Sequence, residues 1–240
     1  MNKKLFPITQ DRNYFCLLID PENYARKELT EVIREANAAG VDYILLGGSL
    51  LSKPIDPVIK HIKKQTSIPV FLFPGNIMQI SDYADGILLL SMISGRNPEL
   101  LIGNHVLAAK RLKESQLEIV PTGYMLINGG NTTAVEYISN TQPIPADKTD
   151  IIVSTAIAGE LLGQQTIYLE AGSGAEKSLH TQAIEQVKKH IQIPLIVGGG
   201  LKEPEDIRRV SKAGANLVVV GNTIEQHPEK LKKMVKSLQK

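Results

Sequence analysis

Eight short apolar runs recur along the chain, and each is followed by a segment that is polar or has the periodicity of an amphipathic helix. The runs are nearly continuous in Val, Ile and Leu, which is typical of parallel strands buried on both faces. Eight such strands alternating with helices in 240 residues favour a closed parallel (β/α)8 barrel over a doubly wound sheet. The runs lie at residues 14–20, 42–48, 69–75, 85–91, 118–127, 166–172, 194–200 and 216–222.

The interval between the third and fourth runs differs from the others. Elsewhere the pattern predicts full helices, such as ELTEVIREANAA, which stops at Gly40, and PELLIGNHVLAAKRLKES, which opens on Pro98. Here the chain offers little more than GNIMQISDYA, whereas a crossover with its helix needs at least about 10–12 residues. We therefore predict that the third helix is missing or irregular, which would open the barrel wall on one side.

Composition and charge narrow the class of protein. The chain is 42% hydrophobic and 22% charged, so we expect ordinary globular material and one domain over residues 1–240. The 27 basic and 25 acidic residues are well mixed, which argues against a general nucleic-acid binder. No apolar run approaches the roughly 18 residues of a membrane span, and residues 1–15 lack the apolar stretch of a signal peptide.

The single cysteine, Cys16, cannot form an internal disulfide, and it is expected to be a small apolar filler of the first strand. Together with the missing membrane and secretion signals, it leads us to expect a cytoplasmic protein.

Glycines follow the seventh and eighth runs, where such barrels commonly bind phosphate. Gly198, Gly199 and Gly200 end the seventh run, and Gly221 and Asn222 end the eighth. Glycines leave backbone N–H groups free to point at anionic oxygens, although they could also serve only tight turns. We interpret them as a phosphate site.

Two carboxylates stand at the ends of predicted strands. Asp20 ends the first run, and Glu170 ends the sixth, directly before Gly172-Ser173-Gly174. The alternatives are a turn cap for Asp20, beside Pro21, and an ion pair at the barrel rim for Glu170. A carboxylate at this face can share Mg²⁺ with substrate phosphates or accept a proton from a hydroxyl.

Five motifs, in this order and spacing, resemble geranylgeranylglyceryl phosphate synthase and its heptaprenyl relatives. They are LIDP (18–21), GGS (47–49), YLEAGSGA (168–175), GGG (198–200) and VVVGN (218–222). The resemblance covers nearly the full chain, and residues 91–103 and 121–139 are similar to the archaeal-type branch. It implies a modified TIM barrel with an irregular third helix. The implied reaction transfers a prenyl group, here geranylgeranyl, from its diphosphate to the 3-hydroxyl of sn-glycerol 1-phosphate, giving an ether lipid precursor.

The resemblance also implies the site residues. It places Mg²⁺ on Asp20 and Ser49, and it makes Glu170 the catalytic base, with Tyr168 orienting the glycerol. The implied glycerol phosphate site comprises Tyr168, Leu169, Glu170, Ala171, Gly172, Ser173, Gly174, Gly199, Gly200, Gly221 and Asn222.

Two positions depart from the family pattern. Leu18 stands where the heptaprenyl branch carries a lysine that contacts the glycerol phosphate, which favours the archaeal-type assignment. Pro21-Glu22-Asn23 stands where many relatives carry an aspartate followed by a basic residue, so Glu22 is a candidate second carboxylate at the metal.

A prenyl chain requires a long apolar groove. Residues 69–75 and 87–94, with Met125 or Leu126, are the candidates for its lining, and the gap at the third helix is its expected exit.

Three further features of the sequence each allow a structural and a functional interpretation. The basic stretch 227–240 is expected to be a closing barrel helix, with a membrane-facing patch as the alternative. We expect a homo-oligomer, because the apolar face of PELLIGNHVLAAKRL fits a subunit interface as well as barrel packing.

The five histidines lack metal-ligand spacing and are expected in helices away from strand ends, without a catalytic role. They are His61, His105, His180, His190 and His227.

Two other functions stay open at this point. A sugar-phosphate isomerase on a phosphate barrel would need a second acid at the end of the fifth strand, where the chain reads GYMLIN. A barrel that binds phosphate or prenyl diphosphate without turnover would fit the glycines equally well.

Overall fold

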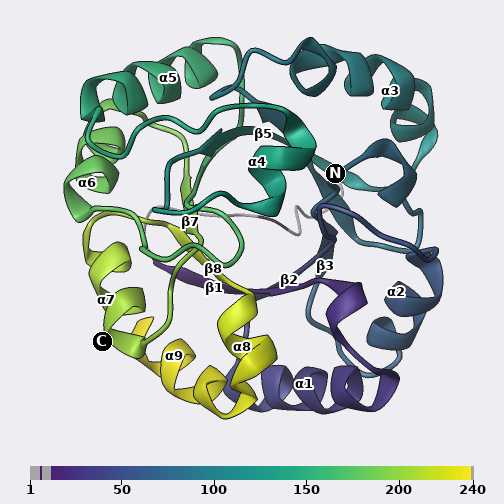
Figure 1. Cartoon of the computed structure of the whole chain (residues 1–240). Coiled ribbons are helices and arrows are strands. Elements are labelled where there is room, and N and C mark those ends of the chain that lie inside the picture. The colour runs from purple at the N-terminus through teal and green to yellow at the C-terminus, as the bar shows by residue number, and fades with distance from the viewer. Residues whose placement is uncertain (1–5, 7–11, 239–240) are drawn as a thin grey trace.

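The structure is a computed structural model that describes Phe6 and residues 12–238. Its eight strands form a closed parallel barrel in chain order, with β8 paired to β1 (Figure 1). The strands are β1 (Tyr14–Ile19), β2 (Tyr43–Leu46), β3 (Val70–Leu72), β4 (Gly86–Met92), β5 (Glu118–Leu126), β6 (Thr166–Glu170), β7 (Leu195–Gly198) and β8 (Leu217–Val220). All eight predicted strands and the (β/α)8 barrel are confirmed.

Helices surround the barrel, and two short ones lie over its mouth. The helices are α1 (Arg26–Ala39), α2 (Asp56–Lys63), α3 (Asn104–Glu114), α4 (Ala134–Ser139), α5 (Thr149–Leu161), α6 (Thr181–His190), α7 (Pro204–Lys212), α8 (Asn222–Gln226) and α9 (Leu231–Leu238). Short turns of 3-10 helix are η1 (Pro21–Asn23), η2 (Ile77–Gln79) and η4 (Pro228–Lys230), and η3 (Glu99–Gly103) is a π-helix. Figure 1 looks onto the carboxyl ends of the strands, with α4 and α8 toward the viewer.

The core consists of two apolar layers, because successive residues of a strand point to opposite sides. Phe15 and Leu17 of β1 face the surrounding helices, where they join a large cluster with residues such as Val32 of α1. Tyr14 and Cys16 point into the barrel and pack in a second cluster. Cys16 is fully buried, as expected for an apolar filler.

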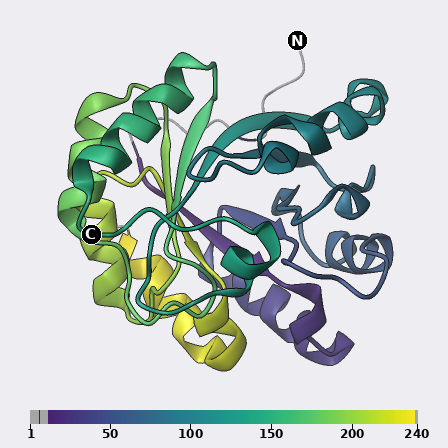
Figure 2. The ribbon, with the colours of Figure 1, turned by 45° about the horizontal axis from the view of Figure 1, so that its top comes forward.

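The connection from β3 to β4 contains only the short turn η2, which confirms the missing helix (Figures 1 and 2). Gln79 of this turn is 2% exposed, and its side chain forms hydrogen bonds with the neighbouring loops. Its side-chain N–H donates to the Gly48 carbonyl at 2.7 Å, and its Oε1 accepts from the Gly75 N–H at 3.2 Å. The irregular segment therefore holds the loops after β2 and β3 together.

The predicted helix boundaries agree with the structure. Gly40 ends α1 in the left-handed region, at φ +77°, where glycine is favoured. Pro98 directly precedes η3, which continues into α3. Leu231, Met234 and Val235 of α9 are buried, so the C-terminal stretch is the closing barrel helix as far as residue 238.

Two expectations concern the ends of the chain. Residues 239 and 240 lie outside the described residues, and so does most of the N-terminal segment that was expected to lack a signal peptide. Within Phe6 and residues 12–238, no helix is long and apolar enough to cross a bilayer.

Candidate active site

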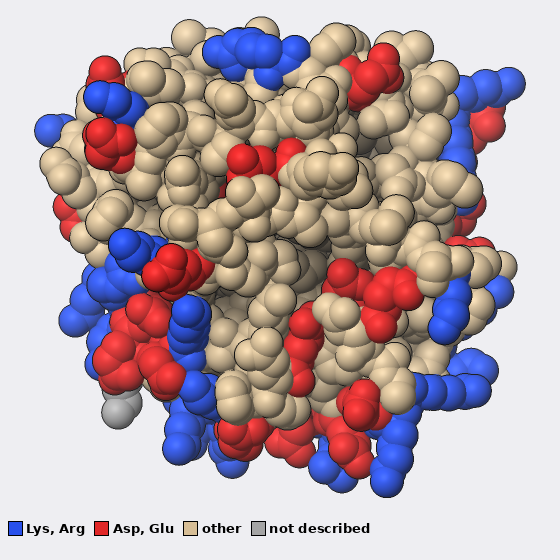
Figure 3. All heavy atoms as spheres, in the orientation of Figure 1, with Lys and Arg blue, Asp and Glu red and all other residues tan. Residues whose placement is uncertain are grey.

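A cavity of about 570 Å³ opens at the carboxyl ends of the strands. Uncharged residues make up most of the middle of this face, and lysines and arginines gather toward its edges (Figure 3). The cavity wall takes residues from the ends of all eight strands or the segments that follow them, including Tyr124 of β5. Most of the predicted site residues meet there. They are Asp20, Ser49, Tyr168, Glu170, Ser173, Gly174, Gly199, Gly200, Gly221 and Asn222.

Three residues of the predicted glycerol phosphate site are not part of the cavity wall. Leu169 and Ala171 are buried among the residues that face the helices. Gly172 follows Ala171, and its N–H donates to Glu170 Oε1. Only the backbone of Leu169 and Ala171 is therefore available to a ligand.

Glu170 is a buried carboxylate at the base of the cavity. It is 5% exposed, and its Oε1 accepts from the Gly172 N–H at 2.7 Å. Burial raises the pKa of Glu170 to about 7, although the Gly172 N–H and the Tyr168 hydroxyl favour the ionised form. Among the described residues it forms no ion pair with a lysine or arginine, so the expected alternative of a rim salt bridge is wrong. A carboxyl with a pKa near 7 suits general-base chemistry.

Gly199 shows why the loop after β7 consists of glycines. Its φ is +83°, a conformation that side chains rarely adopt. A Cβ at this position would clash with Glu170 Oε1 and would lie 2.8 Å from both the Ala171 and Gly172 backbone nitrogens. The loops after β6 and β7 thus touch backbone to backbone around the Glu170 carboxylate.

Tyr168 belongs to an aromatic group at the top of the barrel interior. Its ring stacks on Phe73 with centroids 5.4 Å apart and lies 5.4 Å from the Tyr124 ring. Its buried hydroxyl makes no hydrogen bond of good geometry within the described residues, and burial raises its pKa well above the ordinary value. The hydroxyl therefore stays protonated beside Glu170 and can donate to a ligand.

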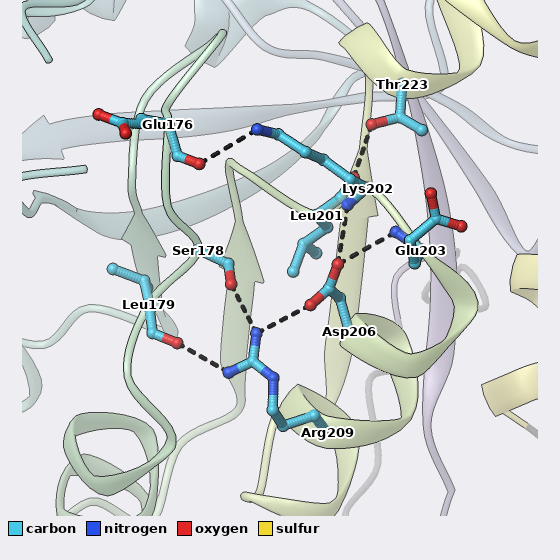
Figure 4. A network of polar contacts seen from close by, with 9 residues as sticks. All are labelled: Glu176, Ser178, Leu179, Leu201, Lys202, Glu203, Asp206, Arg209 and Thr223. Carbon is cyan, nitrogen blue, oxygen red and sulfur yellow. Dashed lines mark hydrogen bonds and ion pairs between the residues drawn. The ribbon is translucent and has the colours of Figure 1, made fainter. Parts of the chain in front are cut away.

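Side-chain hydrogen bonds join the loops after β6, β7 and β8. The Ser173 hydroxyl donates to Asn222 Oδ1 at 2.7 Å, and the Thr223 hydroxyl donates to the Leu201 carbonyl at 2.6 Å. Arg209 of α7 donates to the Leu179 carbonyl at 3.1 Å and to Asp206, which caps the start of α7 (Figure 4). The three loops that carry the glycines thus form one cross-linked group.

Asp20 has the surroundings of a cation ligand as well as those of a turn cap. Its Oδ1 accepts from the Glu22 N–H at 3.0 Å, which caps η1 as the alternative interpretation expected. Its carboxylate also packs against Gly48, next to Ser49, so closely that a Cβ on Gly48 would lie 2.7 Å from Asp20 Cγ. Burial raises the pKa of Asp20, and no basic partner is in ion-pair distance among the described residues. A half-buried carboxylate without a counter-charge fits a divalent cation.

The second carboxylate near Asp20 is Glu225, which the sequence did not point to. Glu22 is fully exposed to solvent and accepts from the Ser52 backbone N–H at 2.7 Å. Glu225 of α8 lines the cavity, accepts from Asn23 Nδ2 at 3.0 Å, and has a pKa raised by burial and by the charge of Asp20. Within the described chain no group of three or more His, Cys, Asp or Glu could hold a metal.

An apolar arm of the cavity runs along β4 toward α3. Its wall includes Phe73, Leu89, Leu90 and Leu100 and reaches Ala108. The cavity also contacts the η2 segment, where the helix is missing. Met125 and Leu126 are buried and do not line it, so that expectation is wrong. Both side chains pack in the barrel core, one on each side of β5.

His105 corrects the expectation that all histidines lie away from strand ends. Its Nε2 lies 3.0 Å from the Leu90 carbonyl, near the end of β4, and the residue lines the cavity. His227 also lines the cavity, after α8. Neither contact could be read from spacing, because both depend on how α3 and α8 pack against the barrel.

The chain is similar to known proteins over nearly its full length. Residues 7–239 match the PcrB family. The chain is 48% identical over 221 residues to a geranylgeranylglyceryl phosphate synthase from Chitinophaga pinensis, covering 92% of this chain and 88% of the relative. It is 38% identical over 218 residues to a protein of the same name from Methanosphaera stadtmanae, covering 90% and 89%.

Solved structures give the same result. The crystal structure of (S)-3-O-geranylgeranylglyceryl phosphate synthase from Thermoplasma acidophilum, in complex with substrate sn-glycerol-1-phosphate, superposes with a TM-score of 0.93 at 31% identity and covers 99% of both chains. An N-acetylmannosamine-6-phosphate 2-epimerase from Clostridium perfringens shares the fold alone, with a TM-score of 0.59 at 15% identity.

Proposed function

The chain belongs to the PcrB family, and we propose that it joins geranylgeranyl diphosphate to the 3-hydroxyl of sn-glycerol 1-phosphate, releasing diphosphate and forming an ether lipid precursor. It is a prenyltransferase that acts on glycerol phosphate. One observation supports the proposal most: a carboxylate with a pKa near 7 lies where a glycine-lined pocket meets an apolar arm. A phosphorylated alcohol and an apolar chain can therefore meet at a base.

The glycerol phosphate binds in the loops after β6, β7 and β8. Backbone N–H groups of Gly199, Gly200 and Gly174 surround the phosphate, and their left-handed conformations leave those groups unshielded by side chains. The hydrogen bond between Ser173 and Asn222 keeps two of these loops in place. The Tyr168 hydroxyl donates to a glycerol oxygen and orients it.

Glu170 accepts the proton of the attacking hydroxyl. The Gly172 N–H fixes the carboxylate through Oε1, which leaves Oε2 for the substrate. The proton passes from the glycerol hydroxyl to Glu170 as the new carbon–oxygen bond forms and the bond from carbon to diphosphate breaks. Because the carboxylate is buried, water competes poorly for the prenyl carbon.

Mg²⁺ is the cofactor that we propose, and Asp20 and Ser49 are the residues that would hold it. When bound, it would neutralise charge on the diphosphate leaving group. The unpaired, half-buried Asp20 carboxylate supports this assignment. Few protein ligands are needed, because Mg²⁺ usually takes further ligands from water and substrate phosphates.

The apolar arm along β4 accommodates the prenyl chain. Leu89, Leu90 and Leu100 offer a hydrophobic wall that continues to Ala108. The arm passes the segment without a helix, where a long chain can leave the barrel.

We propose a homo-oligomer that works in the cytoplasm. Ala108 and Leu112 of α3 pack on the barrel, whereas Val106 and Leu107 are 67% and 69% exposed. Leu161 and Leu162, at the end of α5, are also exposed. Such apolar surface supports a subunit contact. The free, buried Cys16 fits a reducing compartment.

The test uses the purified protein, Mg²⁺, labelled sn-glycerol 1-phosphate and prenyl diphosphates of increasing length, followed by extraction of the lipid phase. We expect a labelled ether lipid from the wild type and from Glu22→Ala, and roughly a thousandfold less from Glu170→Ala or Asp20→Ala. Absence of product with every chain length, or equal product from sn-glycerol 3-phosphate, would contradict the proposal. A sugar-phosphate isomerase is disfavoured because β5 ends at Leu126 without an acid.

A further inference from the structure

Few basic side chains reach the cavity, although its proposed ligand is a phosphate. Among the described residues that line it, the only lysines are Lys202 and Lys230, and there is no arginine. A phosphate monoester carries close to two negative charges at pH 7. Backbone N–H groups supply partial charges only, so at least one full positive charge is expected nearby.

Lys230 is already occupied. Its ammonium forms an ion pair with Glu203 at 2.5 Å and donates to the Lys202 carbonyl at 3.3 Å. These contacts hold the end of η4 against the loop after β7. Lys230 is therefore a structural cation at the rim.

Lys202 is different, because its ammonium has no carboxylate partner within the described residues. It donates only to the Glu176 carbonyl, at 3.1 Å. Figure 4 shows the Glu176 carboxylate turned away from the Lys202 ammonium, so the contact is with the backbone. Glu176 follows Gly172-Ser173-Gly174, and the tip of Lys202 thus lies alongside the glycine loop after β6.

The backbone of Lys202 is held in place, whereas its side chain can change conformation. Its backbone N–H donates to Asp206 Oδ2 at 3.1 Å, and Asp206 in turn accepts from Arg209 at 3.1 Å (Figure 4). The side chain itself is exposed and has four rotatable carbon–carbon bonds. A hydrogen bond to a phosphate oxygen is charge-assisted on both sides, and it is stronger than one to a neutral carbonyl.

We propose that Lys202 binds the phosphate of the glycerol phosphate and supplies its full positive counter-charge. This inference rests on the proposed function. The lysine lies on the loop after β7, two residues after Gly200. In the unliganded protein the Glu176 carbonyl holds the ammonium beside the pocket, and the phosphate replaces that carbonyl on binding.

The experiment measures the dissociation constant of sn-glycerol 1-phosphate by calorimetry, without prenyl substrate, at several salt concentrations. Lys202→Met should weaken binding about tenfold or more, and Lys202→Arg should restore most of the loss. Lys177→Met is the matched control. Lys177 is also an exposed lysine and lies on the loop after β6, but it is not part of the cavity wall. It should bind like the wild type.

The salt dependence separates charge recognition from loop support. Wild-type affinity should fall as salt increases, and Lys202→Met should show a flatter dependence. Equal affinity in Lys202→Met and wild type would overturn the inference, and so would weaker binding with an unchanged salt dependence. If the wild type binds no glycerol phosphate and makes no ether lipid, the proposed function itself fails; binding that is insensitive to Lys202 overturns only this inference.

Discussion

The two sides of the cavity are built differently. On the side of β6, β7 and β8, the strands are buried throughout, and hydrogen bonds such as Ser173–Asn222 and Thr223–Leu201 join their loops. On the side of β3 and β4, one helix is missing, and Leu89, Leu90 and Ser91 of β4 are only partly buried. The comparison teaches that a fixed polar frame suits a small charged ligand, whereas a more open apolar side suits a chain of variable length.

Asp20, which directly follows β1 and lines the cavity, should give the largest effect when changed. We expect Asp20→Asn to reduce turnover at least as much as loss of Glu170, by roughly a thousandfold, because charge on the leaving group loses its stabilisation. Affinity for glycerol phosphate should stay within about twofold of the wild type. Steady-state kinetics and Mn²⁺ binding followed by electron paramagnetic resonance are the measurements.

Glu22→Gln is the control for that prediction, because the Glu22 carboxylate binds Ser52 instead of facing the cavity. Equal loss of metal binding in Glu22→Gln would show that the carboxylate assignment is wrong.

Ionisation of Glu170, on the polar side, should make the folded protein less stable as pH rises. Its folded-state pKa of about 7 lies above its ordinary value of 4.5, so the folded protein binds the extra proton between these values. The free energy of unfolding should therefore fall by about 3 kcal/mol from pH 4.5 to pH 7 through this group. Glu170→Gln should lack this fall, and its melting temperature should exceed that of the wild type at pH 8 but not at pH 4.5.

Gly199 tests how tightly the polar frame is fitted. Gly199→Ala introduces a Cβ that clashes with Glu170 and with two backbone nitrogens, and it strains a φ of +83°. We expect KM for glycerol phosphate to rise at least about tenfold, as one loop is displaced. Gly163→Ala is the matched control, since Gly163 has φ +88° with nothing within 4 Å of an added Cβ. Equal kinetic effects in both variants would show that strain alone is responsible.

The structure could be predicted from the sequence where burial leaves a simple pattern. Strands buried on both faces are continuous apolar runs, and the short interval before β4 is too small for a helix, so both features were predicted correctly. Asp20 and Glu170 were found because they are charges directly after such runs. Strand ends of a parallel barrel share one face, which brings these residues together.

The remaining site residues depend on how helices pack, which leaves no local pattern. Glu225 and Asn23 come from α8 and η1, far apart in the chain, and meet only because β8 closes on β1. Lys202 is one of many lysines in the sequence, and only the hydrogen bonds around Asp206 place it at the cavity. Successive residues of β5 point alternately into the barrel and toward the helices, and Met125 points toward the helices. Because the residues around it are apolar on both sides of the strand, the sequence does not show which side Met125 takes.

Leu90 tests the open, apolar side, and its effect should be the smallest. Leu90→Trp fills part of the arm, so turnover with long prenyl diphosphates should fall a fewfold while short ones are little affected. KM for glycerol phosphate should stay unchanged, because the polar side is not touched. A uniform loss with all chain lengths would show that the prenyl chain does not follow β4.

The most direct test of the account is the ratio of kcat/KM in the wild type to kcat/KM in Glu170→Gln, measured as a function of pH. The division cancels the titration of the substrate phosphate, which both enzymes share. If Glu170 is the base, the ratio rises about tenfold per pH unit below pH 7 and levels off above it. A ratio that stays constant from pH 5 to pH 9 would contradict a catalytic base at the meeting point of the two sides.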